Sequence, residues 1–515
     1  MMMATKMKMP LSLLSRSNSV CTIAYHRRRW CRRRVFSVLT PEDAGRRASE
    51  MATSLLQQQQ QEQQPRHDDD ENTVNKKIST LLSHAGIVDS QDNSPQAPPI
   101  HIATTYTRPA DGIYEEGDFK YARMDNPTRL LLEKTVFDLE CINLSRIASS
   151  SQQEDSSASN DNDSHPTSSL AFASGLMAVT NILLAHSSPI TILLQDDLYH
   201  GTSTLFFDVF ARHSNVRTVP VDMSQALSVA EAISNIATER NDDSKREENI
   251  IVWMESPSNP KCQIVDIESI CSAVQHVQQD ESIAPYVKCT TVVDGTMSSP
   301  VLTRSLELGA DISLHSATKY LGGHSDALLG VLTASPVTAR GQELFPTLKE
   351  TQILAGGVAS PWDSWLVLRG LRTLVVRIQQ QCRSAMKLAE YFEMKRCEDP
   401  IGEGLVHAVH YPGLKFHPQH DVASRQMSGG YGGVLSIELN DEISATAFAG
   451  ALQTIHRATS LGGTETLIEH RASVEPPERR VSPPGLLRIS VGLEDPDDLI
   501  CDIETALDIT AKICK

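Results

Sequence analysis

The sequence contains no uninterrupted run of about 18 apolar residues, and this absence excludes a transmembrane helix. It has ten cysteines but no C-x-x-C pair, which argues against a zinc ribbon, a thioredoxin-like site or a small disulfide scaffold. Scattered cysteines of this kind are typical of reduced thiols in an intracellular protein. Positive charge is in deficit, because 47 Lys and Arg face 64 Asp and Glu and leave a net charge of −17. Nucleic acid and anionic membranes are therefore disfavoured as main partners.

Three common catalytic signatures are also missing. The chain has no G-x-G-x-x-G, no Walker A loop and no H-E-x-x-H, so the usual indications of a dinucleotide, nucleoside-triphosphate or zinc-protease site are absent. What remains is an ordinary globular composition, 40% hydrophobic and 22% charged, in a chain of 515 residues. That length has room for two or three domains of ~150 residues each.

The N-terminal segment has a composition unlike the rest of the chain. Met1 to Thr40 holds nine basic residues and no Asp or Glu, with Ser and Thr between them. This composition is typical of an organelle transit peptide, and a disordered basic arm that touches RNA or DNA is the alternative. The Gln-rich run Gln57–Gln64 predicts a linker. We predict a leader and linker over 1–74, with import into a plastid or mitochondrion; initiation at Met51 would give a cytoplasmic form instead.

The body of the chain reads as an α/β protein. Three short β-rich runs, Ile250–Glu255, Cys289–Asp294 and Asp311–His315, alternate with helical patterns and predict a mostly parallel sheet. Each run delivers polar residues just past its carboxyl end, where ligands bind in open α/β sheets. A helical pattern from about Ser364 to Tyr391 carries one apolar stripe and predicts a connector to a second domain. The strand-like Gly433–Leu439 and a closing amphipathic helix predict a smaller α+β unit.

These patterns divide the chain into four parts. We expect the leader and linker, an N-terminal arm over 75–135, a large domain over 136–370 and a small C-terminal domain over 371–515. Two polar stretches, at about 149–169 and 239–249, read as surface insertions in the large domain.

One lysine, Lys319, lies in a setting that solvated lysines do not usually have. It follows an apolar strand, has Ser316 and Thr318 beside it, and precedes the paired glycines Gly322 and Gly323. An S-x-x-K serine hydrolase would also need S-D-N and K-T-G elements, and neither occurs. The other interpretation is a Schiff-base lysine, whose amine becomes nucleophilic in a desolvated, electropositive pocket.

A Schiff-base lysine that works through pyridoxal phosphate needs a carboxylate, an aromatic face and a phosphate cradle. Asp294, at the end of an apolar strand, is a candidate partner of the ring nitrogen, although such an Asp is often only a turn residue. Tyr199 is a candidate for stacking on the ring, or else a half-buried core tyrosine. Ser174-Gly175-Leu176 opens a helix whose free N–H groups favour phosphate, or is a plain N-cap and packing glycine.

Blocks of residues along the chain, from about His84 to the C-terminus, occur in a recognisable order. They are Pro98–Ile100, Tyr121–Arg123, Asn126–Thr128, Ala173–Gly175, Glu255–Pro260, Leu308–Asp311, His315–Asp326, Leu368–Leu371, Tyr411–Leu414, Ser460–Gly463 and Arg488–Gly492. In these blocks the sequence resembles the Cys/Met-metabolism family of pyridoxal-phosphate enzymes, which includes the cystathionine γ-synthases, cystathionine γ- and β-lyases and methionine γ-lyases. The resemblance implies fold type I, the aspartate aminotransferase architecture, with a large sheet domain and a smaller C-terminal α+β domain.

The resemblance also implies a role for individual residues. Lys319 would hold the cofactor and shuttle protons, Asp294 would pair with the pyridinium and Tyr199 would stack on it. The phosphate would be bound by Gly175, Leu176, Ser316 and Thr318, and by Tyr121 and Arg123 of a neighbouring subunit. The substrate α-carboxylate would bind Arg488, and Asn259 and Ser460 would contact cofactor or substrate. The family pattern further implies an obligate dimer, usually paired into a tetramer.

The sequence departs from the family pattern around the substrate side chain. Gly295, Met297 and Thr459 replace residues common in the family, and the run from His470 to Val474 lacks the family's His-Pro-Ala. The run Ala458–Gly463 resembles γ-type members, so we expect cystathionine γ-synthase or γ-lyase chemistry. Cystathionine β-lyase and methionine γ-lyase are the alternatives, and a catalytically inactive scaffold is a remote one. The expected partners are small amino acids and further copies of the chain, with no metal.

Overall fold

The computed structural model describes residues 78–87, 95–115, 117–144, 167–187, 189–212, 215–240, 247–398, 404–475 and 480–514. The predicted leader and linker, and most of the two polar insertions, lie outside these residues. At the insertion borders, β1 (Ser169–Phe172) begins and α7 (Ala226–Arg240) runs as far as Arg240.

A seven-stranded sheet forms the larger part of the described chain. Its strand order is β1-β7-β6-β5-β4-β2-β3, and β2, β3, β4, β5 and β6 run parallel while β7 is reversed. The bounds are β2 Ile190–Leu194, β3 Val216–Pro220, β4 Glu248–Glu255, β5 Val287–Asp294, β6 Ile312–Ser316 and β7 Gly330–Ala334. The predicted mostly parallel sheet and its three apolar strands are confirmed.

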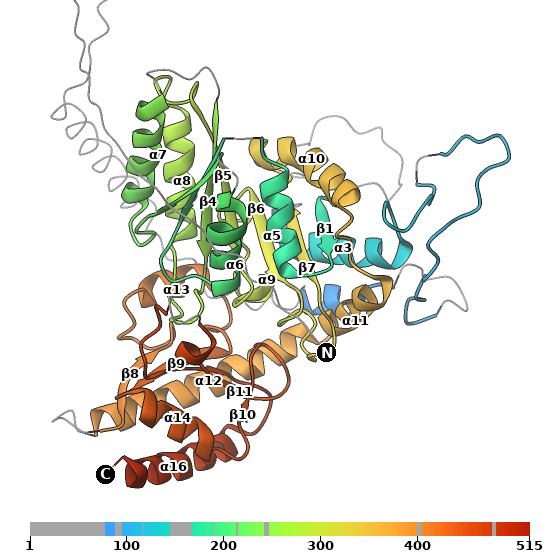
Figure 1. Ribbon diagram of the computed structural model, residues 1–515. Helices are drawn as coiled ribbons and strands as arrows, with labels where there is room; N and C mark the ends of the chain where they lie inside the picture. Colours follow the sequence, from blue (N-terminus) through green and yellow to red (C-terminus); the bar gives the residue numbers. More distant parts are fainter. Residues whose placement is uncertain are drawn as a thin grey trace, which may run out of the picture. The chain divides into compact units, whose positions relative to one another are not determined.

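The central strands are buried on both faces because helices cover them. Every residue of β4 and β2 is buried, which fits their continuous apolar runs. In Figure 1, α7 and α8 (Ile267–Gln278) lie on one side of β4 and β5, and α5 (Gly175–Leu184) and α6 (His200–Thr204) lie on the other. The remaining helices of this part are α3 (Pro127–Glu140), α9 (Ser299–Leu302) and α10 (Ala339–Ala355).

A second sheet of five strands forms the C-terminal part, in the order β10-β11-β12-β9-β8. Its bounds are β8 Val406–His410, β9 Val434–Leu439, β10 His456–Arg457, β11 Leu467–His470 and β12 Leu486–Ser490. The helices here are α13 (His420–Gln426), α14 (Glu442–Ala451), α15 (Arg471–Val474) and α16 (Pro496–Ile513). The predicted strand Gly433–Leu439 is confirmed as β9, and the predicted closing helix is confirmed as α16. The domain boundaries at 136 and 371 remain a prediction.

The connector differs from the expected single helix over Ser364–Tyr391. It consists of α11 (Pro361–Leu371) and α12 (Leu374–Cys397). The break follows Gly370, whose α-carbon packs so closely on the loop that an added Cβ would lie 2.2 Å from the Gly322 carbonyl oxygen. The Gly370 carbonyl accepts from the Thr373 N–H (3.1 Å) rather than continuing an α-helical ladder. The prediction of one helix was wrong because this contact comes from a segment distant in sequence.

Helix α12 joins the two cores. Its N-terminal Leu374 and Ile378 pack in the core that contains Leu321, while Leu388 and Phe392 pack against the second sheet. Figure 1 shows α12 running from the first sheet to the second. The predicted connecting function of this segment therefore holds, although the helix is shorter than expected.

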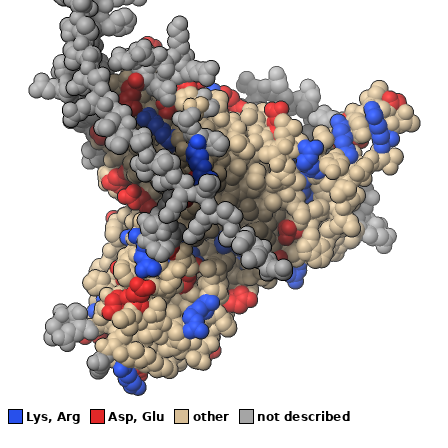
Figure 2. Space-filling model, viewed as in Figure 1, with Lys and Arg blue, Asp and Glu red and all other residues tan. Residues whose placement is uncertain are grey.

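The N-terminal segment 95–125 projects from the rest of the described residues, at the right in Figure 1. Its basic residues between 101 and 125 are Arg108, Lys120 and Arg123, and Figure 2 shows basic side chains grouped on the projecting segment. The Lys120 ammonium lies 4.6 Å from the centre of the Tyr114 ring, a cation–π contact.

Two further findings concern the described residues together. Within the described ranges, no helix has both the length and the apolar character needed to cross a bilayer. The eight cysteines found there are all unpaired, and five of them are buried.

Candidate active site

Lys319 lies in a tight turn that follows β6. Its N–H donates to the Ser316 carbonyl (3.0 Å), and the Gly323 N–H donates to the Lys319 carbonyl (2.7 Å). The side chain is largely buried, and Nζ donates to Ser460 Oγ at 2.7 Å. Burial, helped by the Arg488 guanidinium, lowers the pKa of Lys319 to about 8. The predicted reactive lysine therefore has the desolvated, electropositive surroundings that favour a nucleophilic amine.

Two buried carboxyl groups lie side by side at the ends of β4 and β5. Glu255 and Asp294 are register partners on these neighbouring parallel strands. Burial raises the pKa of both, and the negative charge of Asp294 raises the pKa of Glu255 further. The Thr296 N–H donates to Asp294 Oδ1 (3.0 Å). A cationic group at Asp294 would relieve this like-charge pair.

Glu255 belonged to a quoted block but was not predicted as a site residue. One oxygen accepts from the Tyr199 N–H (2.9 Å) and the other from the Asn259 N–H (2.7 Å). It thereby fixes the backbones of two predicted site residues. Its place at a strand end next to that of Asp294 was the signal in the sequence that could have identified it.

Tyr199 begins α6, immediately after the turn that follows β2. Its ring packs against His200 in an edge-on arrangement, with centroids 4.9 Å apart. Gly201 is required here, because an added Cβ would lie 2.5 Å from the Tyr199 ring. Burial raises the pKa of the Tyr199 hydroxyl, which keeps the phenol neutral.

The N-terminus of α5 faces the lysine loop. Ser174 caps this ten-residue helix by accepting from the Met177 N–H, which leaves the N–H groups of Gly175 and Leu176 without a capping partner from Ser174. A Cβ added at Gly175 would lie 3.2 Å from Ser316 Oγ. The structure therefore brings together the helix end and the hydroxyl that were predicted to bind phosphate, and the phosphate role itself remains a prediction.

Thr318 has a different surrounding from that expected. Its hydroxyl donates to the Leu329 carbonyl (3.2 Å) and accepts from the Leu329 N–H (2.9 Å). The loop thus uses this side chain to hold itself against the start of β7. Thr296 Oγ1, which we did not predict, accepts from the Ser316 N–H (2.8 Å) and so positions Ser316.

Arg488 lies on β12, 4% exposed. Nη1 donates to Asn259 Oδ1 (3.1 Å) and Nη2 to the Ser460 carbonyl (2.8 Å). Glu469 Oε2 forms an ion pair with Nη2 at 2.9 Å, since Glu469 is its register partner on β11. The structure therefore brings Arg488, Asn259 and Ser460 together as predicted, and adds Glu469, which local sequence patterns do not reveal.

Tyr121 and Arg123 have their contacts elsewhere in the chain. Arg123 Nη1 donates to the Ile353 carbonyl at the end of α10 (2.6 Å) and its guanidinium lies 5.7 Å from the Tyr121 ring centre. Tyr121 is 45% exposed. Both lie on the segment expected to reach a neighbouring subunit, and that role remains a prediction.

The departure at Gly295 has a structural reason. A Cβ at this position would lie 2.8 Å from the His315 ring. His315 in turn binds Glu140 Oε1 (2.5 Å) on α3. The chain needs glycine after Asp294 because this buried histidine occupies the space.

These residues fit pyridoxal phosphate, the cofactor that the sequence resemblance implies. The N–H groups of Gly175 and Leu176 at the start of α5 suit a phosphate. Asp294 is buried next to the like charge of Glu255, so it suits a protonated ring nitrogen. The Lys319 amine suits an aldehyde. No cluster of three or more potential metal ligands occurs in the described part of the chain.

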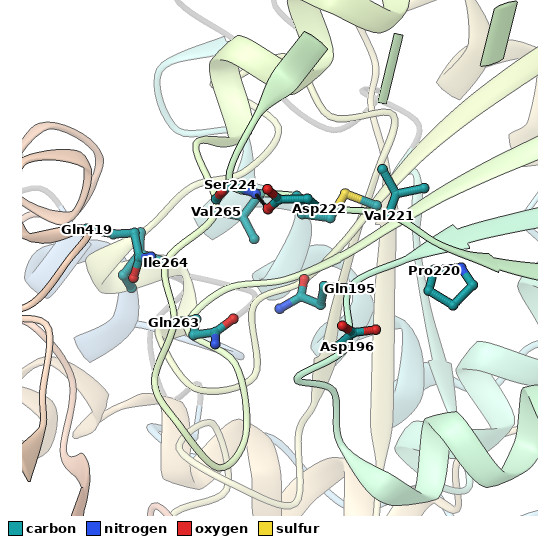
Figure 3. Close-up of a pocket in the computed structure, with 11 residues that line it drawn as sticks. Gln195, Asp196, Pro220, Val221, Asp222, Ser224, Gln263, Ile264, Val265 and Gln419 are labelled. Atoms are coloured by element: carbon teal, nitrogen blue, oxygen red, sulfur yellow. Dashed lines mark hydrogen bonds between the residues drawn. The ribbon is translucent and has the colours of Figure 1, made fainter. Parts of the chain in front are cut away.

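A separate cavity of about 330 Å³ lies beyond the ends of β2 and β3. Figure 3 shows Gln195, Gln263 and Asp196 around it. None of the predicted site residues lines it. Gln195 links the two regions, because its amide exchanges hydrogen bonds with the backbone N–H and C=O of Glu255.

Comparisons with known proteins identify the family. The model of the family described as "Cys/Met metabolism PLP-dependent enzyme" matches residues 164–508. A cystathionine beta-lyase of Coxiella burnetii is 35% identical over 443 residues, covering 84% of this chain and 99% of that protein. A cystathionine gamma-lyase of Bacillus subtilis is 33% identical with the same coverage. The crystal structure of cystathionine gamma synthase from Xanthomonas oryzae pv. oryzae in complex with cystathionine gives a TM-score of 0.68 at 30% identity, over 84% of this chain and 98% of that one.

Proposed function

Because the chain belongs to the Cys/Met metabolism PLP-dependent enzyme family, we propose that it acts at the γ-carbon of sulfur amino acids or homoserine esters. The reaction is of the cystathionine γ-synthase or γ-lyase type. The observation that carries this proposal is the contact of Ser460 with two predicted site residues: its Oγ accepts from Lys319 Nζ and its carbonyl accepts from Arg488.

Each side chain has a role in the proposed reaction that follows from its charge and position. When bound, pyridoxal phosphate supplies the electron sink for the negative charge left at the α-carbon. Lys319, with a pKa of about 8, exchanges a proton with that carbon. Arg488 holds the α-carboxylate, a task for which a planar guanidinium is better suited than lysine. Asp294 would hold a proton at the ring nitrogen, and Tyr199 would stack on the ring.

The choice of the γ-carbon rests on the sequence around Ser460. Ser460 accepts from Lys319 Nζ, so the run Ala458–Gly463 that resembles γ-type members lies beside the proton-transfer group. A γ-reaction needs a second proton removed, from the β-carbon, and a lysine held at this position is available for both transfers.

Product analysis tests the proposal. The purified holoenzyme is incubated with L-cystathionine alone, and separately with an activated homoserine ester plus cysteine. Cysteine with 2-oxobutyrate indicates a γ-lyase, and net cystathionine synthesis indicates a γ-synthase. Homocysteine with pyruvate would contradict a γ-reaction, and a holoenzyme that forms no product from any of these would contradict the proposal.

Cystathionine β-lyase chemistry is a second candidate. Relatives from Coxiella burnetii and Lactococcus lactis, 35% and 34% identical, carry that name. Both reactions use the same lysine, arginine and aspartate, so the products decide between them.

The assembly is also a proposal. Arg123 contacts the Ile353 carbonyl and the Tyr121 ring, and in the family pattern these two residues reach the phosphate of a neighbouring subunit. We propose a dimer, paired into a tetramer, and its mass in solution tests this.

For the location in the cell, we propose import into a plastid or mitochondrion. The support is the acid-free, Arg-rich composition of residues 1–40. A fusion of this segment to a fluorescent protein tests it, and a purely cytoplasmic signal would contradict it.

A further inference from the structure

Arg488 forms an ion pair with a carboxylate of its own chain. Its register partner Glu469 lies directly opposite on β11 and reaches Nη2 at 2.9 Å. Both side chains are almost completely buried, at 4% and 7% exposure. A substrate α-carboxylate that binds Arg488 must therefore compete with the Glu469 carboxylate.

The donors of Arg488 show what must change on binding. Nη2 has two hydrogens, and its partners are the Ser460 carbonyl and Glu469. A bidentate carboxylate needs two parallel N–H groups on one edge of the guanidinium, and both two-donor edges include Nη2. One partner of Nη2 must give way. Glu469 is the one that the incoming negative charge repels.

A second buried arginine, Arg471, also pairs with Glu469. Arg471, 1% exposed, follows β11 as the first residue of α15. Its Nη1 donates to Glu469 Oε2 at 2.8 Å, the same oxygen that pairs with Arg488. Arg471 is one of the residues by which this sequence departs from the family's His-Pro-Ala run.

The rest of the environment holds Arg471 in place without competing for Glu469. Glu475 lies 3.8 Å from Arg471 Nη2, but its oxygens accept from Ser482 and from the Val481 N–H. His200 Nδ1 lies 3.4 Å from Nη2. Burial and the charge of Arg471 lower the pKa of His200, which keeps this ring neutral.

We propose that Arg471 is a positioning residue for substrate binding: it holds Glu469 when the substrate α-carboxylate replaces Glu469 on Arg488. In the free protein, Glu469 is shared by two guanidinium groups. In the complex, Arg488 pairs with the substrate and Arg471 pairs with Glu469, so no buried charge is left without a partner. This inference rests on the proposed role of Arg488, and it holds for any α-amino acid substrate.

Two other roles for Arg471 lead to different outcomes. A group that binds an anion on the substrate side chain would affect only substrates with such a side chain. A structural anchor for the segment around Glu475 would affect folding, and removing the charge of Glu469 would not repair the damage.

The experiment uses glycine, which has the α-carboxylate and amine but no side chain. Its dissociation constant is measured by calorimetry with the holoenzyme and the variants R471M, R471K, E469Q and E469Q/R471M. The control is R457M, the same substitution at an exposed arginine whose guanidinium binds backbone carbonyls at the end of α14. KM and kcat for the identified substrate are measured in parallel.

We expect R471M to raise the glycine dissociation constant about tenfold or more, because Glu469 would then be left buried and unpaired on binding. The double variant should return to within about threefold of the wild type, as a neutral amide can be displaced without that penalty. R471K and R457M should bind glycine nearly as the wild type does, and KM should change in R471M more than kcat.

An unchanged glycine affinity in R471M would overturn the proposal, as would a double variant as weak as R471M. Glycine binding does not depend on which sulfur amino acid reacts. A wrong assignment of the reaction would therefore appear in the wild-type products, and a wrong role for Arg471 would appear in the glycine affinities.

Discussion

Lys319 and Ser460 are 141 residues apart in the chain, yet Lys319 Nζ donates to Ser460 Oγ at 2.7 Å. One follows a strand of the seven-stranded sheet, and the other precedes β11 of the five-stranded sheet. Ser460 also supplies the carbonyl that accepts from Arg488. Ser460 thus contacts both the proposed reactive lysine and the proposed carboxylate-binding arginine, and it brings side chains from the two sheets together.

Replacing Lys319 tests the central assignment. K319A should lower kcat by more than about 100-fold, the usual contribution of a positioned acid–base group. Borohydride reduction of the wild-type holoenzyme should fix the cofactor on the peptide that contains Lys319. A tag on another lysine would refute the assignment, and K319R with wild-type activity would do so too.

The pKa of Lys319 predicts a pH dependence. The folded value is about 8 against the ordinary 10.5, so the neutral amine appears at lower pH than in an exposed lysine. The rate of cofactor uptake by apoenzyme should rise about tenfold between pH 7 and pH 9 and then level off. Stopped-flow absorbance measures it; a rate that keeps rising above pH 10 would indicate an unperturbed lysine.

Asp294 should affect activity and stability in opposite directions. Burial raises the pKa of Asp294 above its ordinary 3.8 in the folded apoenzyme. Between the ordinary pKa and the raised one, the native protein therefore binds more protons than the unfolded chain, and the stability of the fold falls as the pH rises through that range. At pH 7 the charged form is therefore unfavourable. D294N should raise the apoenzyme Tm by roughly 2 °C and lower kcat at least about 100-fold. A stable D294N enzyme with normal kcat would exclude the pyridinium role.

Gly330 should be needed for the phosphate cradle. A Cβ there would lie 2.4 Å from the Ser174 carbonyl oxygen, so G330A must shift the start of α5. We expect at least about tenfold weaker cofactor binding, measured by absorbance titration of apoenzyme. G450A, on an exposed face near the end of α14 with its nearest neighbour at 3.7 Å, is the matched control and should bind normally.

Mixed oligomers test the proposed sharing of sites. K319A and R123M should each be nearly inactive when pure. If Arg123 serves a neighbouring subunit, refolding them together should restore about a quarter of the wild-type activity, since half the dimers are mixed and each has one intact site. No recovery would place Arg123 and Lys319 in the same site of a single chain.

The elements predicted best are those whose signal is local. The strands that end at Glu255, Asp294 and Ser316 are short runs rich in strand-favouring residues, and they are almost entirely buried. Ser174 as the N-cap of α5 was also visible, since capping depends on a hydroxyl beside the first turn.

The features that were missed depend on contacts between distant segments. The break between α11 and α12 follows from the approach of Gly370 to Gly322. The hydroxyl of Thr318 binds Leu329 across the loop rather than remaining free. Neither contact leaves a pattern in the residues around it.

The sequence by itself determined the α/β class and marked Lys319 and Asp294 as candidate site residues, because strand burial and strand-end polarity are properties of a few adjacent residues. Only the tertiary structure decided that Glu469 forms an ion pair with Arg488 and a second one with Arg471. Cross-strand register sets which side chains face each other, and register is fixed by the packing of whole sheets rather than by any short stretch of chain.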